Sequence, residues 1–203
     1  MVAKRDDWMS VNDFLALDRE SLDQKYEYRN GAMIAMAGGS KHHGMLISNT
    51  HLILGNHLKG RPCFVFTEMT LKIENEALLP DLMVTCDAKD LAEAENPTYI
   101  EHPTLVIEVL SPSTENVDRN EKFLKYTYCP SIQEYVLINY DYMLVQTYTR
   151  NGLQWIYTGF MQDQDLELNS IGLTVPVKDI YDRIVLPPFD PFRRYRKQNK
   201  LSL

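Results

Sequence analysis

The sequence predicts an α/β protein in which a mixed β-sheet is flanked by helices, and three observations favour this class. Residues 104–111 form an apolar run rich in β-branched residues, typical of a strand buried on both faces. Residues 43–58 carry apolar side chains at helical spacing, and two Asn-Gly pairs separate runs that suit the arms of β-hairpins. The 203 residues are 44% hydrophobic and 24% charged, so one domain with a substantial core is expected.

The N-terminal part is predicted to contain a short helix, a β-hairpin and a long helix. Ser10 and Asp13 form a capping pattern before the first apolar group. Asn30 and Gly31 predict a type I′ turn, because both central residues of that turn need a positive φ. The expected elements are a helix over 14–17, strands over 25–29 and 32–36, and a helix over 43–58 that ends near Gly60 and Pro62.

The central part is predicted to place one helix between buried strands. A polar, acid-rich stretch over 87–103 is expected to be an exposed excursion with a helical turn. A helix begins near Asp118, after a Ser-Pro-Ser-Thr turn, and ends at Pro130. The expected strands are 63–73, 79–86, 104–111 and 134–139.

The C-terminal part is predicted to add β structure to this core. Asn151 and Gly152 lie between apolar runs over 143–149 and 153–160 and predict a second hairpin. A further strand over 166–175 and a short helix from Pro176 to Tyr181 follow. We therefore expect one domain over 1–190, with its core at about 43–140, hairpin additions at both ends, and a basic tail over 191–203.

The charge distribution limits the class of partner. A net charge of −7 argues against a protein that coats nucleic acid without specificity. The tail nevertheless holds five of the 21 basic residues. It fits either a solvated terminus or a segment that contacts nucleic acid.

Cysteine usage and hydropathy bear on the cellular compartment. Cys63, Cys86 and Cys129 are an odd number without close spacing, so we expect small core residues and neither a disulfide nor a zinc site. No apolar run approaches the roughly 18 residues that span a bilayer. The N-terminus carries acidic residues where a secretory signal would need an apolar stretch. A cytoplasmic protein without a membrane partner is expected.

One carboxylate, Glu108, lies within the most apolar strand, where an ionised group is costly unless it is paired or binds a metal. Strand periodicity places Glu108 on one definite face, and Asp81 can meet it if the two strands are neighbours. Two carboxylates about 4 Å apart repel by roughly 4 kcal/mol at an effective dielectric near 20. A Mg²⁺ ion would offset this repulsion. A buried ion pair between Glu108 and Lys122 is the alternative.

The helix after this strand carries the candidate cation. On a helix that begins near Asp118, the residues Asp118, Lys122, Lys125 and Tyr126 fall on one side. Asp118 itself fits an N-cap, with Glu121 as its capping-box partner, and is expected to have no catalytic role. Solvated lysines supported by neighbouring acids remain the alternative for Lys122 and Lys125.

Residues 79–84, 103–114 and 118–126 together resemble the motifs of the PD-(D/E)XK nuclease superfamily. More narrowly, these motifs and residues 26–31, 36–43 and 133–138 resemble the bacterial Uma group of restriction-endonuclease-like proteins, formerly a domain of unknown function. The resemblance extends over about residues 10–185. It implies a restriction-endonuclease-like mixed sheet flanked by helices.

The resemblance also implies functional residues. Asp81 and Glu108 would hold Mg²⁺, with Mn²⁺ as a substitute, and a lysine would lie two residues after Glu108. Leu110 occupies that position, so the implied catalytic lysine is Lys122, on the following helix, with Lys125 as the second choice. The remaining family matches, Glu27 and His43, are accessory candidates, for which cross-strand pairing or a purely structural histidine is the alternative.

The implied activity is Mg²⁺-dependent hydrolysis of DNA phosphodiester bonds by a restriction-type endonuclease, with a homodimer expected from the resemblance and from the need to cut two strands. The alternative is a catalytically inactive nuclease fold that binds nucleic acid or a protein partner. The net charge and Leu110 favour the alternative, whereas the set of Asp81, Glu108 and Lys122 favours the enzyme.

Overall fold

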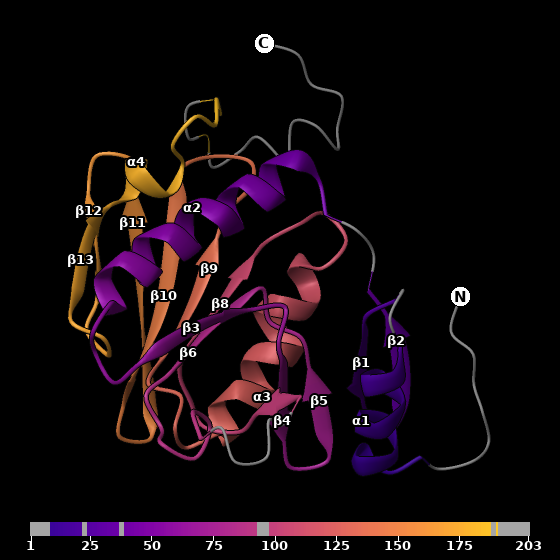
Figure 1. The fold of residues 1–203 in the computed structure, drawn as a ribbon. Helices are drawn as coiled ribbons and strands as arrows, with labels where there is room; N and C mark the ends of the chain where they lie inside the picture. Colours follow the sequence, from indigo (N-terminus) through magenta and orange to yellow (C-terminus); the bar gives the residue numbers. More distant parts are fainter. Residues whose placement is uncertain (1–8, 22–23, 37–38, 93–97, 188–189, 191–203) are drawn as a thin grey trace.

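A six-stranded mixed sheet forms the centre of the computed structural model, which describes residues 9–21, 24–36, 39–92, 98–187 and 190 (Figure 1). Its strand order is β11-β10-β9-β8-β6-β3, and the β8–β9 pair is parallel while the others are antiparallel. The strands are β3 (Phe64–Thr67), β6 (Leu82–Thr85), β8 (Pro103–Val109), β9 (Glu134–Ile138), β10 (Leu144–Asn151) and β11 (Gln154–Met161).

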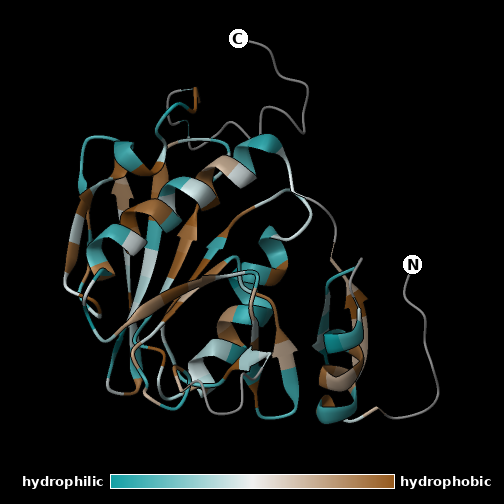
Figure 2. Cartoon of the chain, viewed as in Figure 1, coloured by the Kyte–Doolittle hydropathy of each residue, from teal (hydrophilic) through white to brown (hydrophobic). Residues whose placement is uncertain are grey.

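Helices cover both faces of this sheet, as the sequence predicted. Helix α2 (Lys41–Leu58) packs on one face, and the π-helix η1 (Val117–Lys122) with its continuation α3 (Phe123–Tyr128) packs on the other. The crossover through η1 and α3 joins the parallel strands β8 and β9, which an antiparallel hairpin cannot join. Figure 2 shows that hydrophobic residues are frequent in the strands at the centre of the sheet.

The alternation along β8 also matches the prediction. Leu105 and Ile107 belong to the buried cluster on the α2 face, and Val106 and Leu110 belong to the cluster with Tyr126 on the α3 face. Glu108 has the parity of Val106 and Leu110. It is therefore directed toward the helix that follows the strand.

The predicted N-terminal hairpin forms at Asn30 and Gly31, whose φ values are +51° and +76°. It joins a second, five-stranded sheet of order β2-β1-β5-β4-β7. Helix α1 (Val11–Glu20), which Ser10 and Asp13 cap as predicted, packs on this sheet through Phe14. The strands are β1 (Tyr26–Arg29), β2 (Ala32–Ala35), β4 (Thr70–Ile73), β5 (Glu76–Leu78) and β7 (Tyr99–Ile100).

The prediction of a single strand over 63–73 was wrong, because the chain changes sheets within it, whereas the strand predicted over 79–86 forms as the shorter β6. Glu68 has a φ of +51° and separates β3 in the six-stranded sheet from β4 in the five-stranded one. The chain returns through residues 79–81, between β5 and β6. Glu68 N donates to Asp81 O at 3.4 Å, so the two crossings lie side by side. Asp81 therefore lies where the two sheets meet.

Two further expectations for the central and C-terminal parts need correction. The excursion over 87–103 contains turn residues and the strand β7, while residues 93–97 fall outside the described chain. The expected strand over 166–175 is instead a hairpin of β12 (Asp165–Leu168) and β13 (Leu173–Pro176), followed by the short helix α4 (Val177–Ile180).

The predicted second hairpin forms between β10 and β11, with its turn one residue later than expected. Asn151 pairs with Gln154, so Gly152 and Leu153 occupy the turn, and Gly152 has a φ of +63°. The predicted basic tail, residues 191–203, lies outside the described residues, and the domain division at 190 stays a prediction. No helix among the described residues is long and apolar enough to span a membrane.

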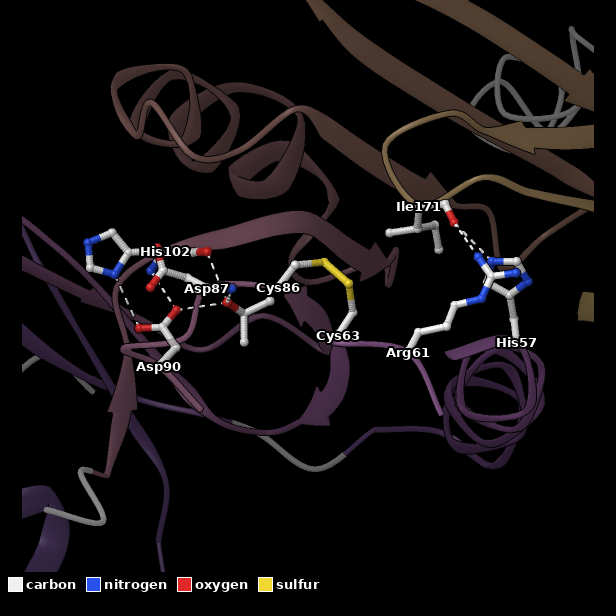
Figure 3. The surroundings of a disulfide bond; sticks show 9 residues. His57, Arg61, Cys63, Cys86, Asp87, Asp90, His102 and Ile171 are labelled. Carbon is white, nitrogen blue, oxygen red and sulfur yellow. Dashed lines mark hydrogen bonds and ion pairs between the residues drawn. A yellow bond between two sulfur atoms is a disulfide. The ribbon is translucent and has the colours of Figure 1, made fainter. Parts of the chain in front are cut away.

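The expectation of three unpaired cysteines was wrong, because Cys63 and Cys86 form a disulfide (Figure 3). The antiparallel register pairs Phe64 with Thr85, which brings the two flanking cysteines opposite each other. This pairing depends on strand register across 23 residues and has no local sequence pattern. Cys129 is free and buried, as predicted.

Candidate active site

A cleft of about 490 Å³ opens where the two sheets, α2 and η1 meet. Its wall contains both predicted metal ligands and the predicted catalytic lysine. It also contains backbone and hydroxyl groups from the turn after β8. The lining residues that bear on its chemistry are Glu27, Arg29, Gly39, Ser40, His43, Asp81, Glu108, Ser111, Ser113, Thr114, Asp118 and Lys122.

Asp81 and Glu108 lie side by side, as the sequence predicted. Asp81 N is 3.4 Å from Glu108 Oε2, and Asp81 Oδ2 accepts a hydrogen bond of 2.7 Å from Val109 N. The antiparallel register of β6 and β8 pairs Leu82 with Ile107, which brings the residues before and after them together. The neighbouring-strand geometry thus positions both carboxylates at one end of the sheet.

Lys122 is buried against Glu108. Its Nζ lies 2.9 Å from Glu108 Oε1, 2.8 Å from Glu27 Oε1 and 3.5 Å from Asp118 Oδ1, and the lysine is only 3% exposed. Tyr126, one helical turn further, donates a 2.8 Å hydrogen bond to the same Glu108 oxygen. These two donors fix the orientation of the Glu108 carboxylate.

The interpretation of Asp118 as a helix N-cap was wrong. Asp118 is 1% exposed and faces Lys122, while the residue before the helix, Asn116, makes no side-chain cap. In an α-helix, a residue eight positions along is rotated by about 80°. The π-helical turn over Val117–Lys122 rotates less per residue, and so Asp118, Lys122 and Tyr126 all reach the sheet.

Of the three accessory candidates, Glu27 and His43 contact the residues of the site, whereas Lys125 pairs with other acids. Glu27, on β1, is 1% exposed and accepts hydrogen bonds from Lys122 and from Leu79 N at 3.0 Å. His43 Nε2 lies 3.3 Å from Asp81 Oδ2. Lys125 instead pairs with Glu76 at 2.7 Å and with Glu121 at 3.1 Å, which agrees with the alternative of a lysine supported by neighbouring acids.

A close approach of the backbone positions His43. A Cβ on Gly39 would lie 2.7 Å from His43 Nδ1, which is closer than real Cβ atoms come. Ser40 caps α2 by accepting a hydrogen bond from His43 N at 3.3 Å. Gly39 and Ser40 therefore hold the histidine at the start of α2, with its ring against Asp81.

The cluster has an excess of negative charge. Glu27, Asp81, Glu108 and Asp118 contribute four carboxylates, whereas the permanent cations in contact with them are Lys122 and Arg29, whose Nε lies 2.9 Å from Glu27 Oε2. A formal excess of two negative charges remains when all four acids are ionised. This excess equals the charge of one divalent cation.

Burial and this charge excess shift the pKa values of the cluster. Burial raises the pKa of Glu108 well above its usual range, with Lys122 opposing the shift and Asp118, Asp81 and Glu27 adding to it. Burial also raises the pKa of Asp118, again opposed by Lys122. Burial alone would lower the pKa of Lys122, but the carboxylates of Glu108, Glu27 and Asp118 outweigh it and raise that pKa. Lys122 is therefore a cation at neutral pH.

The raised pKa of Glu108 predicts how the stability of the metal-free protein depends on pH. Folded Glu108 binds its proton more tightly than unfolded Glu108, so this contribution is complete below about pH 4.5 and is lost as the pH rises through the raised pKa. Urea denaturation in EDTA over a pH series should show Glu108→Gln gaining stability relative to the wild type as the pH rises. A constant difference between the two proteins would contradict the shift.

The acidic pair has free oxygen atoms that suit a hard cation. Among the described residues, Asp81 Oδ1 has no hydrogen-bond donor, and Glu108 Oε2 has only the long bond from Asp81 N. Asp118 Oδ1 is buried and accepts no hydrogen bond within this part of the chain. No three His, Cys, Asp or Glu side chains of the described residues already form a metal site. Two carboxylates plus water ligands would suit Mg²⁺, which usually keeps several waters.

Three residues of the cluster have roles that the sequence did not reveal. Asp118 matched a helix cap, Arg29 matched a hairpin strand, and Tyr126 was only placed on the helix face of Lys122. Arg29 also pairs with Glu121 at 3.1 Å, which ties β1 to η1. The helical spacing placed Asp118 and Tyr126 on one side with Lys122, whereas no local pattern links Arg29 to them.

The mixed sheet, its flanking helices and the acidic pair beside a buried lysine define a restriction-endonuclease-like protein. The fold matches a crystal structure of a putative nuclease belonging to DUF820 from Anabaena variabilis, with a TM-score of 0.72 and 21% identity over 85% of this chain and 97% of that one. A likeness at this identity shows the fold.

The family follows from the sequence comparison. The Uma2 family model, described as "Putative restriction endonuclease", matches residues 11–178, and this chain belongs to that family. The uncharacterized protein slr1290 of Synechocystis sp. is 36% identical over 162 residues, which cover 78% of this chain and 84% of the relative. The uncharacterized protein sll1609 of the same organism is 33% identical over 146 residues, which cover 70% and 82%.

Proposed function

We propose that this protein is a Mg²⁺-dependent endonuclease that hydrolyses phosphodiester bonds of DNA. The observation that carries the proposal is the contact between Lys122 and Glu108 at 2.9 Å, beside Asp81, in an open cleft. Asp81 precedes β6, Glu108 lies in β8 and Lys122 lies in η1, yet the three side chains line the same cleft. Family membership supports the same reaction class.

Asp81 and Glu108 would hold the metal ion through Asp81 Oδ1 and Glu108 Oε2. A bound Mg²⁺, or Mn²⁺ in its place, polarises a phosphodiester and lowers the pKa of a water molecule. Tyr126 and Lys122 occupy the other Glu108 oxygen, and Val109 N with His43 occupies the other Asp81 oxygen. Each carboxylate is thereby oriented with one oxygen toward the cleft.

Lys122 would act as a charged donor, because its raised pKa keeps it protonated and excludes the role of a general base. An ammonium group has three N–H donors. Glu27 and Glu108 accept at 2.8 and 2.9 Å, while Asp118 lies at the longer distance of 3.5 Å. The third N–H is thus available to stabilise the charge that develops on the phosphate oxygens.

The rim of the cleft supports a phosphate-containing substrate. Ser40, Ser111, Ser113 and Thr114, which carry hydroxyl groups, line the same cleft as the acidic pair. Ser40 also begins the 18-residue helix α2, whose N-terminal dipole favours anions. These neutral and weakly positive groups would position the DNA backbone without the strong nonspecific attraction of a basic surface.

The second candidate is a catalytically inactive nuclease fold that binds nucleic acid or a protein. Leu110 in the usual lysine position favours it, as do the ion pairs that already engage Lys122 with Glu27 and Glu108. Such a protein would keep the cleft and the buried cluster but would not cut DNA.

A plasmid assay separates the two candidates. The enzyme is expected to convert supercoiled plasmid to nicked or linear DNA with Mg²⁺ or Mn²⁺ and to lose this activity in EDTA, because the acidic pair needs a cation. Asp81→Asn, which removes one proposed ligand, should abolish both cleavage and the Mg²⁺-induced rise in melting temperature. Cleavage that survives in Asp81→Asn would contradict the assignment. Binding of DNA without cleavage would favour the second candidate.

A further inference from the structure

Strand β11 is an open edge of the six-stranded sheet. Within the described residues, it has a strand neighbour only on the β10 side. It is eight residues long, whereas the other edge strands of the two larger sheets, β2, β3 and β7, have four, four and two. Between Gln154 and Met161 there is neither a charged residue nor a proline. These are the residues that commonly prevent an exposed edge from pairing with another chain.

The hydrogen bonds at one end of β11 show which backbone groups point outward. Leu144 O accepts from Asn139 N at 3.0 Å, so Leu144 bonds on the β9 side of β10. Met161 is the register partner of Leu144 on β11, and its backbone N–H and C=O groups therefore point away from β10. Accordingly, Met161 N donates to Gln164 Oε1 at 2.7 Å and Met161 O accepts from Gln164 N at 2.9 Å. Gln164 therefore closes this end of the edge.

The alternation along an antiparallel strand extends this assignment to the rest of β11. The N–H and C=O groups of Trp155, Tyr157 and Gly159 share the parity of Met161 and also point away from β10. At the other end, Arg150 N donates to Gln133 O at 2.8 Å on the β9 side, which gives its partner Trp155 the same outward direction. The free edge is thus a stretch of three outward-facing residues.

We propose that two copies of this chain pair through β11, antiparallel and about a two-fold axis at Tyr157. In this register, Tyr157 lies opposite the partner's Tyr157, and Trp155 lies opposite the partner's Gly159. Every outward N–H and C=O group of the three residues in each copy then finds a partner, and the sheet continues from one protomer into the next. An unpaired edge becomes an interior strand pair.

A second copy fits this edge because the edge is complementary to itself. A two-fold axis is the commonest symmetry of protein dimers, and an antiparallel pair of identical strands obeys it. No like charges meet, because the strand has no charged residue. Ile156 and Tyr157 are 49% and 53% exposed in the monomer, so pairing would also cover apolar and aromatic surface. In the same register, Ile156 lies opposite the partner's Thr158.

Charge-swap variants at the axis test the proposal. Tyr157→Lys and Tyr157→Glu each place like charges opposite one another and should raise the dimer dissociation constant on the order of 100-fold. A one-to-one mixture of the two variants should recover the dimer, because opposite charges then meet. Light scattering after size-exclusion chromatography over a concentration series measures the mass. Thr174→Lys, at an exposed position of β13, is the matched control and should stay dimeric.

Each outcome bears directly on the interface. A wild-type protein that stays monomeric at every concentration overturns the proposal, and this measurement holds even if a variant fails to fold. A dimer that persists in Tyr157→Lys, or a mixture that stays monomeric, overturns the two-fold axis at Tyr157. The experiment measures molecular mass and not cleavage. Its result therefore does not depend on whether the proposed nuclease activity is found.

Discussion

Lys122→Met is expected to abolish DNA cleavage and to lower the free energy of unfolding by about 3–5 kcal/mol. The lysine is 3% exposed and touches Glu27, Glu108 and Asp118, so its removal leaves three buried carboxylates without their shared cation. Methionine fills a similar volume, which separates loss of charge from loss of packing. The loss of a donor to the developing phosphate charge should reduce the cleavage rate by about 100- to 1000-fold.

Urea denaturation in EDTA and plasmid cleavage with Mg²⁺ measure these two effects. Lys125→Met is the matched control, because Lys125 lies on the same helical segment but pairs with the partly exposed Glu76 and Glu121 at 2.7 and 3.1 Å. Its cost should stay within about 1 kcal/mol, with cleavage retained. Equal effects of the two substitutions, or cleavage by a folded Lys122→Met protein, would contradict the role of Lys122.

Glu108→Gln is expected to eliminate cleavage without destabilising the metal-free protein. The side-chain oxygen of glutamine can replace Glu108 Oε1 and accept hydrogen bonds from Lys122 and Tyr126. Its NH₂ group then replaces Glu108 Oε2, the oxygen that lies 3.4 Å from Asp81 N. It also removes one charge from a cluster with an excess of negative charge. Because the pKa of Glu108 is raised by burial and by the neighbouring acids, metal-free stability at neutral pH should rise.

Melting temperatures with and without Mg²⁺ test the ligand role of Glu108 separately from activity. The wild type should gain stability as the ion binds the folded state, whereas Glu108→Gln should show little or no gain. Glu76→Gln, which alters a partly exposed acid paired with Lys125, should respond to Mg²⁺ as the wild type does. An equal Mg²⁺ response in Glu108→Gln would remove Glu108 from the proposed metal site.

Together these substitutions separate folding from chemistry. Lys122 is the cation that makes a buried acidic cluster tolerable, so its loss should affect both stability and rate. Glu108 is an acid in excess, so its loss should eliminate cleavage and the metal response while the metal-free protein becomes more stable. Proteins commonly retain such destabilising groups where function needs them.

Local sequence patterns were sufficient for the helices, the hairpins and the central pair of acids. The turn at Asn30 and Gly31 forms as predicted because its positive φ values are a property of those residues. Glu108 was recognisable because one ionisable residue in a buried strand demands a partner. Asp81 was recognisable because it begins the next apolar run upstream. Lys122 was expected as a possible ion-pair partner of Glu108, and the family resemblance named it as the catalytic lysine.

Only the tertiary structure decided which other charges join the cluster and where the chain changes sheets. Glu27, Asp118 and Lys122 converge because β1, η1 and β8 belong to different layers, and Coulomb interactions act across space and not along the sequence. The disulfide of Cys63 and Cys86 likewise follows from the register of β3 with β6. The sequence by itself thus determined the local elements and the acidic pair, whereas packing determined the π-helical turn, the surrounding charges and the cleft.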